Sequence, residues 1–101
     1  MDEKATDLPE WEHYIEYIIA DAREKETRDF LATYYPGERM PKFAAQASLL
    51  RLNAIGAQGW ELVHMQPVLV LNDGSVTSGE KFGTNTYLCV FKRQIRRNSN
   101  G

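Results

Sequence analysis

The chain has 101 residues, of which 43% are apolar and 26% are charged, and its formal net charge is −2 at pH 7. This composition is typical of a globular domain and excludes a disordered chain. A net charge near zero provides no general attraction to nucleic acid or to an anionic membrane surface, so we expect neither as a partner.

The chain length, the cysteine content and the distribution of apolar residues limit the number of domains, the metal chemistry and the location that we expect. A chain of this length forms one domain, which we expect over 1–101 with flexible tails at 1–9 and 94–101. Cys89 is the only cysteine, so neither an internal disulfide nor a thiolate metal cluster can form. The start, MDEKATDLPEW, is acidic and polar, and no apolar run approaches the ~20 residues that span a bilayer. We therefore expect a soluble, cytoplasmic protein.

The segment WEHYIEYIIAD at 11–21 is rich in aromatic and β-branched residues, which favour a strand. Side chains alternate between the two faces of a strand. One face would carry Trp11, His13, Ile15, Tyr17 and Ile19, and the other Glu12, Tyr14, Glu16 and Ile18. A helix is the competing interpretation, because several of the same apolar residues also fit helical spacing.

Charged residues dominate the first half of 22–41, where we expect a short surface helix over 23–33. The YYPG stretch that follows predicts a turn, because Pro36 fixes its φ angle and Gly37 adds backbone freedom behind it.

The stretch KFAAQASLLRLNAIGAQG at 42–59 has apolar residues at helical spacing and predicts the main amphipathic helix, with Pro41 in its first turn. We expect Gly59 to cap this helix in the left-handed conformation. Gly56 lies inside the helix, where glycine costs about 1 kcal/mol relative to alanine. We expect it to allow a close approach of the helix backbone to the sheet.

Two more strands follow the helix. The stretch WELVHMQPVLVL at 60–71 alternates so that Trp60, Leu62, His64 and Gln66 would share one face, and Pro67 marks a bulge, an edge or the end of the strand. The turn-rich segment 72–85 predicts a long hairpin loop, and TYLCVFKR at 86–93 predicts the last strand. The predicted class is α+β, in a β-α-β-β order with a small antiparallel-rich sheet and one main helix on one face.

No constellation of reactive residues stands out. The glycines of GAQG end a helix, whereas phosphate binding uses the start of one. His13 and His64 lack neighbouring zinc ligands, and a pair between Cys89 and His64 would lack a third group to orient it. We therefore assign no catalytic residue, no metal and no cofactor. An enzyme that uses His64 with a group across a subunit interface stays an alternative.

The block LNAIGAQGWELV at 52–63, the first strand at 11–19 and the closing YLCVFKR at 87–93 together resemble the small DUF4177 family. This chain departs from the short family pattern in its 22–41 segment and its long 72–85 loop. The resemblance covers under a third of the chain. It implies a β-α-β-β fold, and no catalytic residue, because the family's function is unknown.

The strands are apolar on both faces, and one helix can cover only one face. Burying a large apolar side chain contributes ~1.5–3 kcal/mol, so five left in water would forgo about 7–15 kcal/mol, as much as the whole stability of a typical domain. Either segment 22–41 or a second copy of the chain must cover the other face. We favour a symmetric sheet-on-sheet dimer. Its expected interface is Ile15, Tyr17, Trp60, Leu62, Tyr87 and Phe91, or the set that alternates with them.

These features predict a homo-oligomeric interaction module without catalytic chemistry. The alternative is a small-ligand-binding protein with a pocket at a subunit interface, near the 34–39 and 72–85 loops, because long loops on compact domains often carry function. Its candidate ligand contacts are Tyr34, Tyr35, Arg39 and His64.

Overall fold

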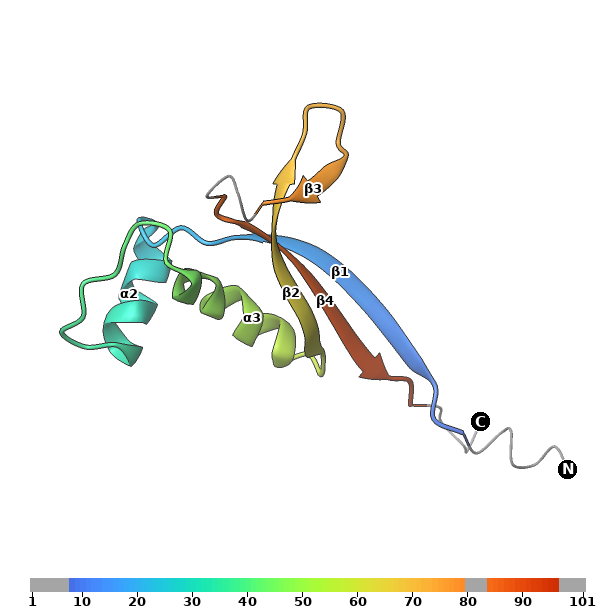
Figure 1. The fold of residues 1–101 in the computed structure, drawn as a ribbon. Coiled ribbons are helices and arrows are strands. Elements are labelled where there is room, and N and C mark those ends of the chain that lie inside the picture. The colour runs from blue at the N-terminus through green and yellow to red at the C-terminus, as the bar shows by residue number, and fades with distance from the viewer. Residues whose placement is uncertain (1–7, 80–83, 97–101) are drawn as a thin grey trace, which may run out of the picture.

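The structure is a computed structural model that describes residues 8–79 and 84–96. The elements in chain order are β1 (Trp11–Ile19), α2 (Lys25–Tyr34), the 3-10 helix η1 (Ala45–Ser48), α3 (Leu49–Gly56), β2 (Glu61–Val70), β3 (Val76–Ser78) and β4 (Thr86–Gln94). The strands form one antiparallel sheet in the order β1-β4-β2-β3 (Figure 1). The α+β class is confirmed, with the extra helix expected in 22–41 present as α2. Strand β3 is an addition within the segment expected to be a loop.

The strand predicted over 11–21 is confirmed and ends two residues earlier, at Ile19. β1 pairs with β4 without a break, from Trp11 opposite Gln94 to Ile19 opposite Thr86. The pairing continues one residue further at the start, where the N–H of Ile95 donates to the carbonyl of Glu10 at 2.9 Å. The sheet therefore reaches into residues expected to be tails. Residues 1–7 and 97–101 of those tails lie outside the described residues.

The main helix begins later than Pro41. The N–H of Ala22 donates to the carbonyl of Lys42 at 2.7 Å, and Ala44 is extended, with φ −61° and ψ 141°. Because Lys42 is held beside the chain that leaves β1, helical structure starts only at Ala45. It begins as η1 and continues as α3.

The two glycines near the end of α3 differ. Gly59 has a φ of +94°, so the expected left-handed cap is confirmed. The expected close approach at Gly56 is wrong, because an added Cβ would meet no atom within 4 Å. Gly56 lies on the exposed side of the helix.

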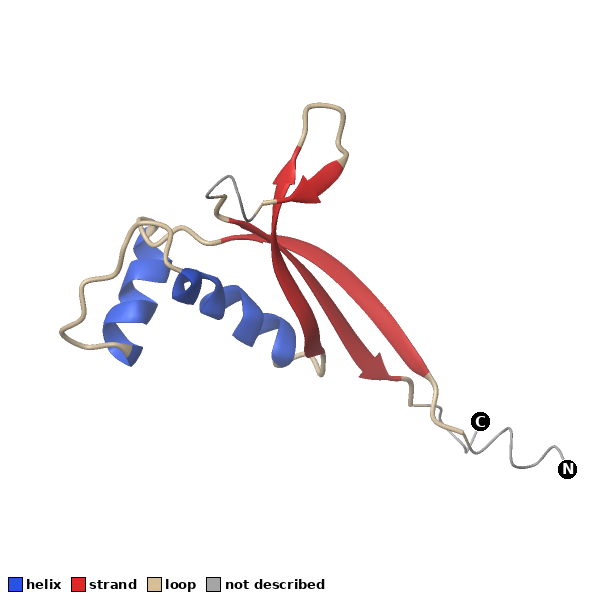
Figure 2. Cartoon of the chain, viewed as in Figure 1, coloured by secondary structure: helices blue, strands red, loops and turns tan. Residues whose placement is uncertain are grey.

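The core lies between α3 and one face of the sheet. Its buried members are Ile18, Ile55, Cys89 and Phe91, with Leu52, Trp60, Met65 and Tyr87 packed around them. A second small cluster joins the end of β1 to α2 and η1 through Ala20, Leu31 and Ala47. Both helices lie on the same side of the strands (Figure 2). Segment 22–41 therefore extends the helical layer and does not cover the other face of the sheet.

A β-bulge interrupts the alternation of β2. Leu62 pairs with Phe91, but His64 pairs with the next residue of β4, Val90, which leaves Val63 as the extra residue. Residues directly opposite each other in an antiparallel pair share a face, so Leu62 and His64 lie on opposite faces. The expectation that they share a face is wrong for this reason. Pro67 does not end the strand, which continues to Val70.

Candidate interaction surface

The face of the sheet that α3 does not cover is called the open face here. Strand β1 contributes Trp11, His13, Ile15, Tyr17 and Ile19, β4 contributes Thr86, Leu88, Val90 and Lys92, and β2 contributes His64 and Gln66. The residues that alternate with these include Ile18, Cys89 and Phe91, which are buried against Ile55 of α3.

The open face is apolar towards β1 and polar towards β2. The exposed fractions are 45% for Trp11, 58% for Ile15, 48% for Tyr17 and 63% for Ile19. In the central strand β4, Leu88 and Val90 are only half-buried. In β2 the corresponding residues are polar, and a ring nitrogen of His64 lies 2.6 Å from Oε1 of Gln66. Where β1, β4 and β2 lie side by side, the most exposed apolar side chains of the open face therefore belong to β1, while Val70 and Val76 are exposed further along, in the β2–β3 hairpin.

Strand β1 also has a free backbone edge in the described part of the chain. The hydrogen bonds at its two ends use even-numbered residues: the carbonyl of Glu10 accepts from Ile95, and the N–H of Ala20 donates to Asn85. Hydrogen-bonded pairs alternate along an antiparallel ladder, and the register of β1 with β4 is unbroken. The odd-numbered residues, which carry the open-face side chains, therefore direct their N–H and C=O groups away from the sheet.

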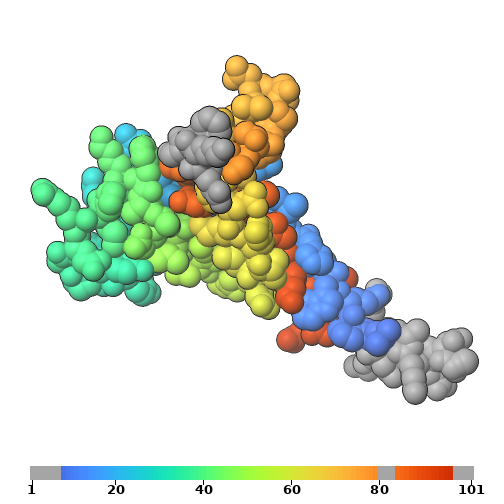
Figure 3. Space-filling view, viewed as in Figure 1, coloured from blue at the N-terminus to red at the C-terminus, as the bar shows by residue number. Residues whose placement is uncertain are grey.

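This edge lacks the features that usually prevent strand addition, which are a proline, a bulge, a lysine or an unpaired inward charge. Both acidic side chains of β1 lie on the covered face and are paired. Glu16 accepts hydrogen bonds from Arg51 of α3 at 2.5 and 2.7 Å and also one from the Tyr14 hydroxyl. Glu12 accepts from Arg93 of β4 at 3.0 Å. Figure 3 shows β1, in blue, along the margin of the molecule.

On the covered face, Arg93 of β4 contacts residues that follow the C-terminal end of α3. Its guanidinium lies 4.1 Å from the centre of the Trp60 ring and donates to the carbonyl of Gln58 at 3.1 Å. The Trp60 ring in turn lies 5.6 Å from the Tyr14 ring. Arg93 also forms an ion pair with Glu12 of β1, which links the two neighbouring strands on this face.

The structure divides the expected interface set between the two faces. Ile15 and Tyr17 lie on the open face and are exposed. Phe91 is buried, with 1% of its surface exposed, and Trp60 and Tyr87 pack against the same core. Leu62 pairs with Phe91 on the covered face and keeps 39% of its surface exposed.

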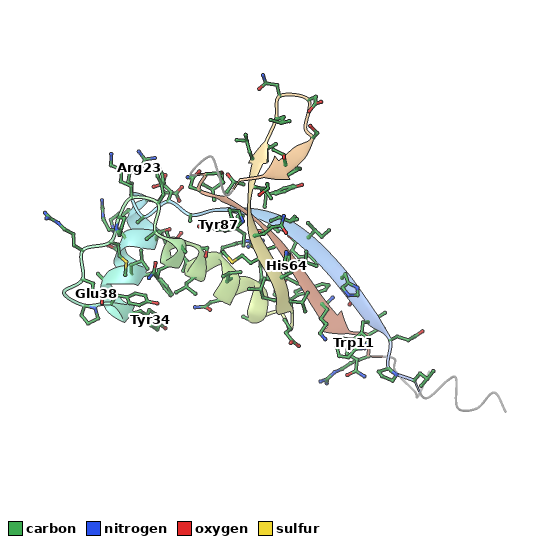
Figure 4. The ribbon with its side chains drawn as sticks, in the orientation of Figure 1. Trp11, Arg23, Tyr34, Glu38, His64 and Tyr87 are labelled. Carbon is green, nitrogen blue, oxygen red and sulfur yellow. The ribbon has the colours of Figure 1, made fainter. Side chains whose placement is uncertain are left out.

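The residues expected to contact a ligand are not brought together within one chain. Tyr34 is exposed at the end of α2 and stacks on Phe30 with the ring centres 4.5 Å apart. His64 lies on the sheet, well away from Tyr34 (Figure 4). Arg39 is exposed in the loop after α2. Tyr35 lines a groove of about 370 Å³ together with Leu52 and Met65.

The arrangement does not favour cysteine or metal chemistry. Strands β2 and β4 do pair, but Cys89 points into the core while His64 lies on the open face, so the two cannot form a catalytic pair. Burial raises the pKa of the Cys89 thiol to about 11. Within 8–79 and 84–96, no group of three or more His, Cys, Asp or Glu side chains could hold a metal ion.

Comparisons with family models, with curated proteins and with solved structures found no match. In the described part of the chain, no helix has both the length and the apolar character needed to cross a bilayer. The surface must therefore be interpreted from its own geometry.

Sequence reasoning missed the free edge of β1. Its alternating residues can be read from WEHYIEYII, but the strand order cannot, because an α+β chain of this kind can place its first strand at an edge or in the centre. Trp11 and Ile19 were consequently absent from the expected interface, although both belong to the exposed set.

Proposed function

We propose that this protein is a homo-oligomeric interaction module that binds a second copy of itself through β1. The observation that carries the proposal is the exposure of Trp11, Ile15, Tyr17 and Ile19, between 45% and 63% of each residue, along a strand whose outer backbone edge has no partner among the described residues. The same open face also carries His13, which lies opposite Lys92 in the register, and His64 of β2.

The exposed apolar surface is large for a domain of this size. Full burial of one such side chain contributes ~1.5–3 kcal/mol, so four that are about half exposed forgo roughly 3–6 kcal/mol. A typical domain is stable by only ~5–15 kcal/mol in total. Covering these side chains would therefore change the stability of the folded chain substantially.

A second copy is the simplest partner for this surface. Helix α2, the other element that could have covered it, packs against η1 on the opposite side of the sheet. In a two-fold dimer the same patch meets itself, so one self-complementary surface is sufficient. We also propose that the chain is related to the DUF4177 family, a relationship that implies no catalytic residue.

The proposal is tested by a charge placed on the surface. Ile15→Glu puts a carboxylate at the middle of β1 and should weaken self-association at least tenfold in sedimentation-velocity experiments. Val70→Glu is the matched control, because Val70 is also a β-branched strand residue with 47% of its surface exposed, but it lies in the β2–β3 hairpin. Equal association of both variants and the unmodified chain would contradict a role for β1.

A small-ligand protein is the second candidate, and the groove beside Tyr35 is the observation that favours it. The groove holds two apolar neighbours, Leu52 and Met65, and two polar ones, Gln46 and Ser48. A ligand present at a hundredfold excess over its Kd would stabilise the folded state by about 2.7 kcal/mol. A thermal-shift panel of metabolites and nucleotides that raises the Tm of no sample would remove this candidate.

A further inference from the structure

We propose that two copies of the chain join β1 to β1 in antiparallel orientation, around a two-fold axis at Ile15, and so form one continuous eight-stranded sheet. This inference rests on the proposed self-association and specifies its geometry. The competing geometry is the sheet-on-sheet dimer, in which the two open faces stack on each other.

The free backbone groups restrict the registers that are available. In an antiparallel pair, directly opposite residues either exchange two hydrogen bonds or exchange none. The outward N–H and C=O groups of β1 belong to its odd-numbered residues, so odd residues of one copy must lie opposite odd residues of the other. A symmetric pairing of this kind is centred on a residue and not between two residues.

The acidic residues and the length of β1 then select one position for the two-fold axis. An axis at Tyr14 would place Glu12 opposite Glu16, and an axis at Glu16 would place that carboxylate opposite its own copy. Like charges directly opposite each other destabilise a strand pair. An axis at His13 or Tyr17 would leave four of the nine residues of β1 without a partner inside the other β1 strand. The axis at Ile15 uses all nine.

The pairs formed around Ile15 are compatible on both faces. On the open face, Ile15 meets its own copy, Tyr17 meets His13, and Trp11 meets Ile19. On the covered face, no acidic residue of β1 lies opposite another, because Glu12 meets Ile18 and Glu16 meets Tyr14. The most exposed apolar side chains of the open face thereby gain the lateral neighbours that an outermost strand lacks.

The sheet-on-sheet geometry fits the same surface less well. It would remove from water the polar half of the open face, which includes His64, Gln66 and Lys92. Burying polar groups without new hydrogen bonds costs free energy, and the outward backbone groups of β1 would still find no partner. Edge pairing satisfies the backbone groups and leaves the polar half in solvent.

A groove beside the same edge is consistent with a neighbouring strand. It has a volume of about 410 Å³ and is lined by Ile19 of β1, Thr27 of α2, and Leu50 and Ala54 of α3. In the proposed register, the segment around Trp11 of the second copy runs past the mouth of this groove, because Trp11 lies opposite Ile19.

Cysteine cross-linking of the full chain tests the register. Cα atoms of a hydrogen-bonded antiparallel pair are about 5.5 Å apart, but their Cβ atoms are farther apart than the ~3.5–4.5 Å of an unstrained disulfide. Ile15→Cys should therefore form a covalent dimer with a short bifunctional thiol reagent. Tyr17→Cys is the control, because two copies of residue 17 would lie about 13 Å apart along the strands. The unmodified chain, with Cys89 buried, should not cross-link.

A mixture of two single variants provides a second, independent cross-linking test of the register. Residues 13 and 17 are opposite each other in the proposed register, so His13→Cys mixed with Tyr17→Cys should cross-link, while each variant alone should not. This result does not depend on the folding of Ile15→Cys.

The outcomes separate the register from self-association itself. If neither Ile15→Cys nor the mixture cross-links although the unmodified chain has the mass of a dimer, the edge geometry is overturned and the proposed function stands. Stacked sheets, which lie about 10 Å apart, would give this result. Equal cross-linking of Tyr17→Cys alone would also overturn the register. A monomeric mass would overturn both proposals.

Discussion

Glycines 56 and 59 stand three residues apart and have opposite roles. An alanine at position 56 meets open space and relieves the cost of glycine in a helix, so Gly56→Ala should stabilise the protein by up to about 1 kcal/mol. At position 59, a φ of +94° opposes any residue with a Cβ. Gly59→Ala should therefore destabilise it by about 1–2 kcal/mol. Urea unfolding of both variants measures the difference, and equal effects would contradict the assigned cap.

Cys89 should behave as a buried apolar residue and not as a nucleophile. Its thiol is fully buried, and burial raises its pKa to about 11 from the ordinary value of 9.0. A thiol reagent should react with the native protein at least tenfold more slowly than with the unfolded chain at pH 8. Rapid reaction of the native thiol would show that the core between α3 and β4 opens readily.

The direction of the shift also fixes the effect of alkaline pH. Because the folded pKa lies above the unfolded one, the neutral thiol stabilises the folded state fully below pH 9, and this contribution is lost as the pH rises from 9 towards 11. Cys89→Ala should remove that part of the pH dependence, although the variant is less stable overall because of the cavity it leaves.

At the scale of elements, the ion pair between Glu16 of β1 and Arg51 of α3 holds the helix to the outermost strand. The hydrogen bonds from Arg51 lower the pKa of the Glu16 carboxyl. A lowered pKa means that the ion pair stabilises the fold above about pH 4.5 and that this contribution is lost as the pH falls through the folded value.

Glu16→Gln should therefore be less stable than the unmodified chain at pH 7, by about 0.5–1 kcal/mol for a partly exposed bidentate pair. The difference should be smaller at pH 3 than at pH 7, because protonation of the folded carboxyl removes the ion pair as the pH falls. Lys25 and Asp29 form an exposed ion pair within α2, so Asp29→Asn provides a control with little effect at either pH. A difference for Glu16→Gln that is the same at both pH values would contradict the clamp.

Some elements could be predicted from the sequence because local patterns determine them. The alternation in 11–19 and the left-handed glycine after α3 are examples. The start of the main helix could not, because the chain at Lys42 is held by a hydrogen bond from Ala22, twenty residues away. The bulge at Val63 also depends on pairing with β4, and it moved His64 to the face opposite Leu62.

At the scale of the whole molecule, one face of the sheet is uncovered by helices, as expected, but it is not apolar throughout. The face is open, and its most exposed apolar residues lie on β1, although Val70 and Val76 of the β2–β3 hairpin are also exposed. That distribution depends on the strand order, which no short-range pattern encodes. This distribution favours a contact between two copies at the edge of the sheet over a contact at its face.

The central claim is that β1 binds a second copy of the chain, and the solution mass tests it most directly. The unmodified protein should have a light-scattering mass of about 23 kDa, twice the 11.6 kDa of one chain, and should move towards the smaller value only on dilution. A mass of one chain that persists at the highest attainable concentration would contradict the account.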